Sequence, residues 1–183
     1  YWGDHKIIYL QKLLEVSKKF HPQRLNDLLK LDIFCYANVP YRIRSFEQIK
    51  VNAKDTVTYD DALAERIEQR VETIGADGKL LMNQQGQVYQ VNLVEKLMVA
   101  LLAKLGNLVI GGGIWLNTQR PEWNDANNSL VGQGLSMVTL SYMRRYVQFV
   151  LTLLENESDE FDVSSEVVEW LTQTALILKD AVS

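Results

Sequence analysis

The sequence predicts an all-α fold of antiparallel helical hairpins, forming a single helical domain over residues 1–183. Three observations support this class. Apolar residues recur three and four residues apart along several long segments, which is typical of amphipathic helices. Helix-capping residues stand at the ends of these segments. Only three prolines occur (Pro22, Pro40 and Pro121), so few positions interrupt a helix.

The first predicted helix runs from Asp4 to about Phe20, because Asp4 is a good N-cap. Pro22 suits the first turn of a short second helix that extends through Leu31. Residues 33–43 lack a helical period and predict an extended, partly buried connection. The first helix is expected to bury one apolar stripe, formed by Ile7, Leu10, Leu13, Leu14 and Phe20.

A third helix is predicted to begin at Asp60 or Asp61 and to end at Gly75. The glycines of the segment 76–90 indicate a small β-hairpin or an ordered loop. Four side chains of the third helix are expected to point inward: Leu63, Ile67, Val71 and Ile74.

The clearest helix follows Asn92, which is a capping residue with Glu95 three positions later, and it ends at Gly106. After a long irregular stretch, another long helix is predicted from about Ser129 to Glu155. An acidic turn then leads into the last helix. The inward residues expected for these last two helices are Leu135, Val138, Tyr142, Phe149, Leu153 and Leu154, followed by Val167, Val168, Leu171, Ala175 and Leu178.

Composition excludes several classes of protein. The net charge is −4 with scattered Lys and Arg, which argues against a nucleic-acid surface. The most hydrophobic region, 93–116, carries three charges and a triple glycine, which argues against a membrane span. A single cysteine, Cys35, and the lack of a signal-peptide pattern favour a cytoplasmic location. His5 and His21 lack the spacing of a metal site, so no metal is expected.

The segment 111–128 does not have the composition of a simple connection between helices. It begins with Gly111-Gly112-Gly113, which lacks the residues of a phosphate loop and indicates a sharp turn or close backbone packing. Indole rings can cover the apolar side of a sugar ring, while amide and guanidinium groups bind its hydroxyls. The polar and aromatic residues of the segment that suit a sugar are Trp115, Arg120, Glu122, Trp123, Asn124, Asp125, Asn127 and Asn128.

The run from Arg120 to Asn128 resembles the Trp-Asn-Asp motif of the (α/α)6-toroid, or six-hairpin, glycosidases and disaccharide phosphorylases, above all the cellobiose-phosphorylase type. In that family the Asp of the motif is the general acid, and the resemblance assigns this role to Asp125. The opening residues Trp2 and Asp4 are similar to aromatic and acidic loop segments at the sugar site of the same toroids. An oligosaccharide or disaccharide substrate is therefore implied.

The resemblance leaves the reaction open. Ala126 stands where a phosphorylase commonly has cysteine, so hydrolysis, phosphorolysis with phosphate as co-substrate, and a non-catalytic sugar site all remain. No organic cofactor is implied. A second carboxylate would complete an inverting mechanism, and Asp4 and Glu122 are the local candidates.

A complete toroid has about twice as many helices as the five or six predicted here, so the resemblance implies a fragment of a larger catalytic domain. The chain starts at Tyr1 rather than Met, which agrees with that expectation. The wide apolar helix faces are then expected to be covered by the remainder of the parent chain or by a homo-oligomer.

The residues alone also support a structural alternative. Asp125 could cap the helix that follows it, because capping aspartates are common. Trp115 and Trp123 could be core anchors, and Glu122 a solvated loop acid. The chain would then be a non-catalytic helical module in which this segment only joins two helices.

Overall fold

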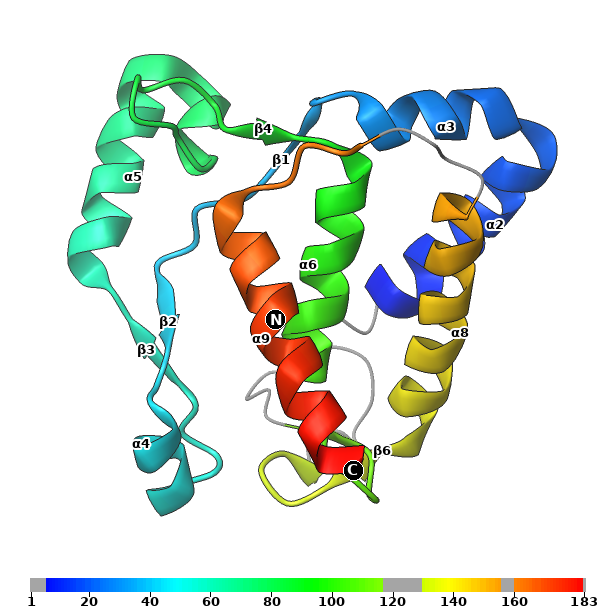
Figure 1. Ribbon diagram of the computed structural model, residues 1–183. Coiled ribbons are helices and arrows are strands. Elements are labelled where there is room, and N and C mark those ends of the chain that lie inside the picture. Colours follow the sequence, from blue (N-terminus) through cyan, green and yellow to red (C-terminus); the bar gives the residue numbers. More distant parts are fainter. Residues whose placement is uncertain (1–5, 117–129, 156–159, 183) are drawn as a thin grey trace.

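The computed structural model describes residues 6–116, 130–155 and 160–182, and three helices stand side by side in its main body (Figure 1). These are α6 (Leu93–Leu105), α8 (Met137–Leu154) and α9 (Ser165–Val182). Along the chain, α6 and α8 run in opposite directions, and α9 turns back beside α6 (Figure 1). The predicted antiparallel helical arrangement is therefore confirmed for these elements. No described helix combines the length and apolar character needed to cross a membrane.

The N-terminal helical segment starts with a π-helical stretch, η1 (Lys6–Leu10), and continues as α2 (Gln11–Phe20) and α3 (Pro22–Lys30). Pro22 lies in the first turn of α3, as predicted. The expected apolar stripe of the first helix was wrong in part, since Leu13 and Phe20 are each 64% exposed. A π-helical turn contains more residues than an α-helical one, so the phase of the buried face changes after it.

One hydrophobic core joins η1, α2, α3, α6 and α8. Tyr146 of α8 is completely buried in it, and its hydroxyl donates a hydrogen bond of 3.0 Å to the carbonyl oxygen of Leu97 on α6. This bond gives the buried phenol the partner that it requires. The other buried side chains of the core are Ile7, Leu14, Leu25, Leu29, Leu93, Val94, Leu97, Leu101, Ile114, Met143, Val150 and Leu153.

Three short antiparallel strand pairs lie among the described residues, so the structure is mostly, rather than entirely, helical. β1 (Phe34–Cys35) pairs with β4 (Gln90–Val91), and β5 (Ile114–Trp115) pairs with β6 (Leu135–Ser136). The third pair joins β2 (Tyr41–Ile43) to β3 (Val57–Tyr59). Residues 33–43 are thus extended, as predicted. Cys35, in β1, is half-buried.

A smaller arm projects from the body through β2 and β3 (Figure 1). Between these strands lies α4 (Phe46–Val51), which Ser45 caps and which the sequence analysis did not predict. The arm ends in α5 (Asp61–Ile74) and the 3-10 helix η2 (Gly75–Lys79). Asp60 caps α5 as predicted, accepting a hydrogen bond of 2.9 Å from the Leu63 amide, and Ile67 is buried. The expectation for Ile74 was wrong, since it is exposed at the helix end.

The segment expected to form a hairpin or an ordered loop is ordered around one bridge between Met82 and Val88. The Asn83 side chain accepts hydrogen bonds from the amides of Gln85 and Gln87, and Gly86 has a φ of 75°. Two backbone hydrogen bonds, from the Asn83 amide to the Gln87 carbonyl oxygen and from the Gly86 amide to the Asn83 carbonyl oxygen, complete the turn.

The helix caps decide where α6 and α8 begin. Asn92 caps α6 as predicted, accepting a 3.0 Å hydrogen bond from the Glu95 amide. The start predicted at Ser129 for the long helix was wrong, because Ser136 is the N-cap of α8 and its hydroxyl accepts from the Thr139 amide at 3.1 Å.

Burial of the last two helices also differs from the prediction. Leu135 precedes α8 in β6, and Val138 lies exposed in its first turn. On α9, Val167 is buried, whereas Val168 and Leu171 are exposed. The reason is that α9 packs mainly against one neighbouring helix, α6.

Candidate functional site

The candidate site identified from the sequence is held at its base by β5 and β6. Trp115 pairs with Leu135 across these two strands. One residue later, the Leu116 amide donates to the Gly134 carbonyl oxygen at 3.0 Å, and the Gly132 amide donates to the Leu116 carbonyl oxygen at 2.7 Å. The chain therefore enters and leaves the segment 117–129 through a closed, hydrogen-bonded base.

The triple glycine shapes this base. Gly111 has a φ of 75°, a backbone conformation that favours glycine, and so forms the predicted turn. A Cβ atom on Gly112 would lie 2.7 Å from the Leu135 side chain, and one on Gly113 would lie 3.1 Å from the Met137 sulfur. The glycines thus allow β6 and the start of α8 to approach closely. This confirms the prediction of a sharp turn and close packing.

A fourth glycine connects the base to the arm of the molecule. Gly132 has a φ of 78°, and a Cβ atom there would lie 2.8 Å from the carbonyl oxygen of Ala53. Ala53 belongs to the connection between α4 and β3. The segment 117–129 therefore rejoins the described chain beside the α4–β3 connection, which the sequence analysis did not associate with the site.

Trp115 is the single predicted site residue in the part of the chain that the structure describes. It is half-buried, and its amide donates a 2.8 Å hydrogen bond to the Asn107 carbonyl oxygen. The backbone of this tryptophan is thus held on both sides, by Asn107 and by the strand pair. The other predicted site residues lie outside the described residues: Asp125, Arg120, Glu122, Trp123, Asn124, Asn127, Asn128, Trp2 and Asp4.

The position of the α8 cap bears on the structural alternative for Asp125. The N-cap of α8 is Ser136, whose hydroxyl also lies 2.8 Å from the Thr139 hydroxyl. The N-cap role at α8 therefore belongs to Ser136. The surroundings of Asp125 lie outside the described residues.

A second polar cluster, missed by the sequence analysis, lies near the start of α6. The Glu95 residue is only 2% exposed, yet both of its carboxylate oxygens have donors. The Tyr36 hydroxyl donates to one oxygen at 3.0 Å, and the Ser164 amide donates to the other at 2.8 Å. Glu95 does not close a capping box with Asn92. It joins three distant segments instead.

Neighbouring groups complete this cluster. The Lys96 ammonium donates to the Cys35 carbonyl oxygen at 2.8 Å and lies 3.8 Å from the centre of the Tyr36 ring. Burial, then the charge of Glu95, raises the pKa of Tyr36 well above its usual value. Burial and Glu95 also raise the pKa of Tyr89, against a hydrogen bond with Ser164 that lowers it. The Glu95 carboxylate is buried and both of its oxygens accept hydrogen bonds. The cluster therefore has the features of a structural contact that connects distant segments of the chain.

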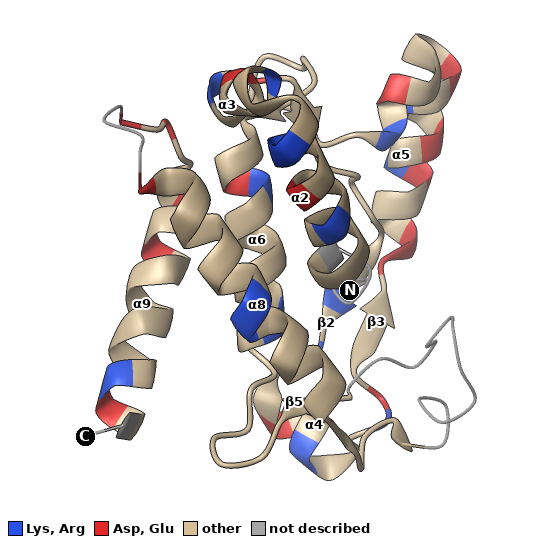
Figure 2. Cartoon of the chain, turned by 90° about the vertical axis from the view of Figure 1, so that its right-hand side faces the viewer, with Lys and Arg blue, Asp and Glu red and all other residues tan. Residues whose placement is uncertain are grey.

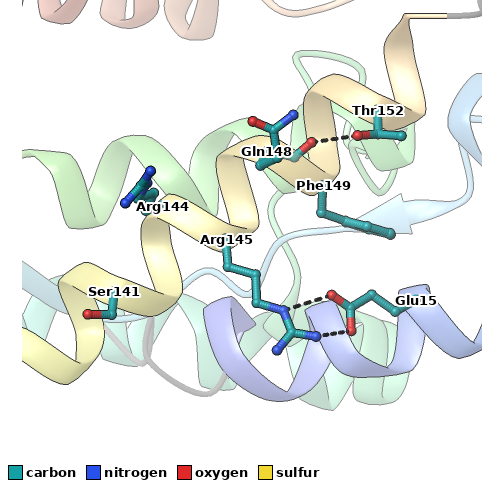
Figure 3. Close-up of a pocket in the computed structure, with 7 residues that line it drawn as sticks. All are labelled: Glu15, Ser141, Arg144, Arg145, Gln148, Phe149 and Thr152. Atoms are coloured by element: carbon teal, nitrogen blue, oxygen red, sulfur yellow. Dashed lines mark hydrogen bonds and ion pairs between the residues drawn. The ribbon is translucent and has the colours of Figure 1, made fainter.

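An open groove of about 470 Å³ runs along α8 beside α2 (Figure 3). The Arg145 guanidinium donates to both carboxylate oxygens of Glu15, at 2.7 and 3.0 Å. Partial burial opposes ionisation of Glu15, but hydrogen bonds from Arg145 and Gln11 and the Arg145 charge lower its pKa overall. The other lining residues are Ser141, Arg144, Gln148, Phe149 and Thr152.

This groove differs chemically from the sequence-predicted sugar site. The charges of Arg145 and Glu15 neutralise each other through an ion pair, Arg144 adds a second positive charge, and Phe149 contributes the aromatic ring of the lining. No three His, Cys, Asp or Glu side chains are grouped to hold a metal within the residues described.

Comparison with known proteins identifies no family for this chain. No family model matches the chain, and no curated protein matches it.

Proposed function

We propose that this chain is a segment of a carbohydrate-active enzyme of the (α/α)6-toroid type, in which Asp125 protonates the glycosidic oxygen. The observation that carries the proposal is the sequence Arg-Pro-Glu-Trp-Asn-Asp-Ala-Asn-Asn at 120–128, preceded by Trp115. It combines a carboxylic acid, indole rings and several amides, which are the groups that recognise and cleave a glycoside.

The described base of this segment supports the proposal indirectly. A general acid must be held in a fixed position relative to the bond that it protonates. The strand pair β5–β6 and the hydrogen bonds of Leu116 hold the described chain at both ends of the segment, and Trp115 lies two residues before it. These contacts suit a loop whose residues have to keep their positions.

The proposed chemistry is a single displacement at the anomeric carbon. Asp125 donates its proton to the leaving oxygen while a nucleophile attacks the opposite face of the sugar. Indole rings that exclude water from Asp125 would raise its pKa and so keep it protonated. Glu122 or Asp4, with its carboxyl group about 6.5–9.5 Å from that of Asp125, would activate the attacking water. Phosphate is the alternative nucleophile, for phosphorolysis.

The general-acid role makes a specific prediction for the Asp125→Asn variant of the full-length protein that carries this chain. Turnover of a disaccharide should fall by roughly 10²–10⁴-fold, because the leaving sugar then departs without a proton. Turnover of the matching dinitrophenyl glycoside should fall far less, since dinitrophenolate needs no protonation. Initial rates on the two substrates measure the difference.

The control for this experiment is Asp77→Asn, at an exposed position of η2 far along the chain from the segment. It should leave both rates unchanged. Equal losses on both substrates for Asp125→Asn would indicate a folding defect and contradict the acid role. Undiminished disaccharide turnover would refute it directly.

A second candidate is a non-catalytic helical interaction module. The exposed apolar side chains of α2 and α9, including Phe20 and Ile177, favour this function. If the full-length protein neither turns over glycosides nor shows a change in tryptophan fluorescence on titration with disaccharides, the module is the better assignment. For either function we propose a cytoplasmic location, consistent with the free Cys35.

A further inference from the structure

Positive charge is concentrated around the open groove that runs along α8 beside α2, which we call the α2–α8 groove. α8 contains two arginines and no acid, and α2 contains three lysines and a single acid, Glu15. Figure 2 looks onto these two helices and shows blue on both. The chain as a whole has a net charge of −4. The groove is therefore an electropositive surface on an acidic chain.

Two lysines of α2 reach across to α8, one turn before and one turn after Glu15. The Lys12 ammonium lies 5.8 Å from the centre of the Tyr142 ring. The Lys18 ammonium donates to the Thr152 carbonyl oxygen at 3.2 Å. A ring and a carbonyl oxygen position these ammonium groups without neutralising them. Lys12, Lys18 and the two arginines thus place four cations around one acid.

Two polar side chains of the lining are open to a ligand. Arg145 is directed at Glu15, whereas Arg144 and Gln148 point away from this ion pair (Figure 3). Neither the Arg144 nor the Gln148 side chain has a hydrogen-bond partner within the described chain. They lie one turn apart on α8, and both are donors. The pair therefore suits carboxylates that are themselves spaced one helical turn apart.

Apolar side chains accompany these cations on both helices. Val16 follows Lys12 by four residues on α2 and is 54% exposed. On α8, Phe149 lines the groove, and Val138, three residues before Ser141, is 63% exposed. A nucleic-acid duplex would meet the cations with phosphates and leave the apolar side chains in water. A segment of protein offers acidic and apolar groups together, and so fits the groove better.

The charged lining also indicates that the groove is covered reversibly. Arg144 is exposed, and the Arg145 side chain is 54% exposed although it is paired with Glu15. Covering such cations permanently would remove their hydration at a large cost in free energy. Permanently covered interfaces are more hydrophobic than this groove. The occupant is therefore assigned to a separate protein that binds and leaves.

From these observations we propose that the α2–α8 groove binds an acidic amphipathic helix of a partner protein. Its carboxylates, one turn apart, accept from Arg144 and Gln148, and its apolar side chains cover Phe149 and Val16. A groove between two helices is a common seat for a third helix. The attraction between opposite charges makes association fast and sensitive to salt. This inference goes beyond the glycosidase assignment and does not depend on it.

Fluorescence anisotropy on the full chain tests the proposal with a labelled helical peptide of the same length as α8, 18 residues. The peptide carries a glutamate at every fourth position and leucines beside the glutamates. Wild type should bind it, and more weakly as salt screens the charges. Arg144→Glu should weaken binding about tenfold, because the new acid repels the glutamates. A peptide with lysine in place of each glutamate should bind Arg144→Glu more tightly than wild type.

The control variant is Arg66→Glu, which makes the same charge change at an exposed position of α5. It should bind the acidic peptide like wild type, and circular dichroism should show both variants folded. The proposal is overturned if wild type does not bind this peptide, or if Arg66→Glu loses as much affinity as Arg144→Glu.

Other occupants of the groove give different results, each of which also overturns the proposal. Equally tight binding of a peptide with serine in place of each leucine would indicate a site for anions alone. Displacement of the acidic peptide by duplex RNA would assign the groove to nucleic acid. Self-association of wild type that Arg144→Glu abolishes, measured by sedimentation velocity, would identify a second copy of the chain as the occupant.

Discussion

At the scale of single residues, Glu95 is a buried acid held by hydrogen bonds from two distant segments. A carboxylate removed from water is stabilised only when hydrogen-bond donors or cations replace the water. Here the Tyr36 hydroxyl and the Ser164 amide supply the donors. A further hydrogen bond of 2.6 Å joins the Asn92 side chain to the Asp162 carbonyl oxygen close by. The chain leading into α9 is thus attached to α6 by polar contacts.

Removing the tyrosine hydroxyl should reveal what this attachment contributes. In Tyr36→Phe, one oxygen of the buried Glu95 carboxylate loses its donor, and we expect a loss of about 1–3 kcal/mol in the free energy of unfolding. Urea unfolding followed by circular dichroism measures it. Tyr142→Phe is the matched control, because Tyr142 lies at the partly buried margin of the core and its ring contact with Lys12 survives the change. If Tyr36→Phe lowers the free energy of unfolding no more than Tyr142→Phe does, the hydrogen bond from Tyr36 to Glu95 does not stabilise the fold.

At the scale of elements, glycine positions determine how neighbouring segments approach. Gly78 in η2 is buried against α5, and a Cβ atom there would lie 2.5 Å from the backbone nitrogen of Val71. Backbone atoms inside a helix cannot move aside as a flexible side chain can. The close packing of η2 on α5 therefore depends on the absence of a side chain at this position.

A pair of glycine substitutions tests this dependence. Gly78→Ala should lower the free energy of unfolding by roughly 1–3 kcal/mol, because η2 must move away from α5. Gly106→Ala should be neutral or stabilising by up to about 1 kcal/mol, since Gly106 is helical and its new Cβ would have ordinary contacts at 3.7 Å. Thermal unfolding of both variants provides the comparison. Equal effects would contradict the packing argument.

At the scale of the whole molecule, the structure consists of a body built around the hydrophobic core and an arm that lies outside this core. The core joins η1, α2, α3, α6 and α8, whereas none of its buried residues comes from α5. Within the described chain, α5 packs mainly against the neighbouring η2. Regions with fewer buried apolar contacts open at lower free energy. The arm should therefore open without unfolding of the body.

Hydrogen exchange in two variants with a shortened side chain tests whether the arm opens separately from the body. Leu97→Ala removes a core side chain that is only 1% exposed, so we expect a loss of about 2–5 kcal/mol and faster exchange throughout α2, α6 and α8. Ile67→Ala should accelerate exchange in α5 and η2 alone. If Ile67→Ala accelerates exchange equally in α6, the arm and the body unfold as one unit.

The sequence by itself determined the local features of this protein. Asn92 and Asp60 cap their helices where predicted, because a cap requires one side chain and an amide two or three residues away. Pro22 begins a helix and the glycines at 111–113 form a close turn for equally local reasons. The proposed sugar site also comes from a local run of residues, of which Trp115 alone falls within the described structure.

Only the tertiary structure decided the features that depend on residues distant in sequence. The pairing of Phe34 with Val91 and the enclosure of Glu95 by Tyr36 and Ser164 need a chain that has already folded back on itself. Apolar periodicity shows that a helix has an apolar face, but the neighbouring helices decide which part of that face is buried. For this reason Leu13 and Leu171, both expected inside, form part of the exposed surface.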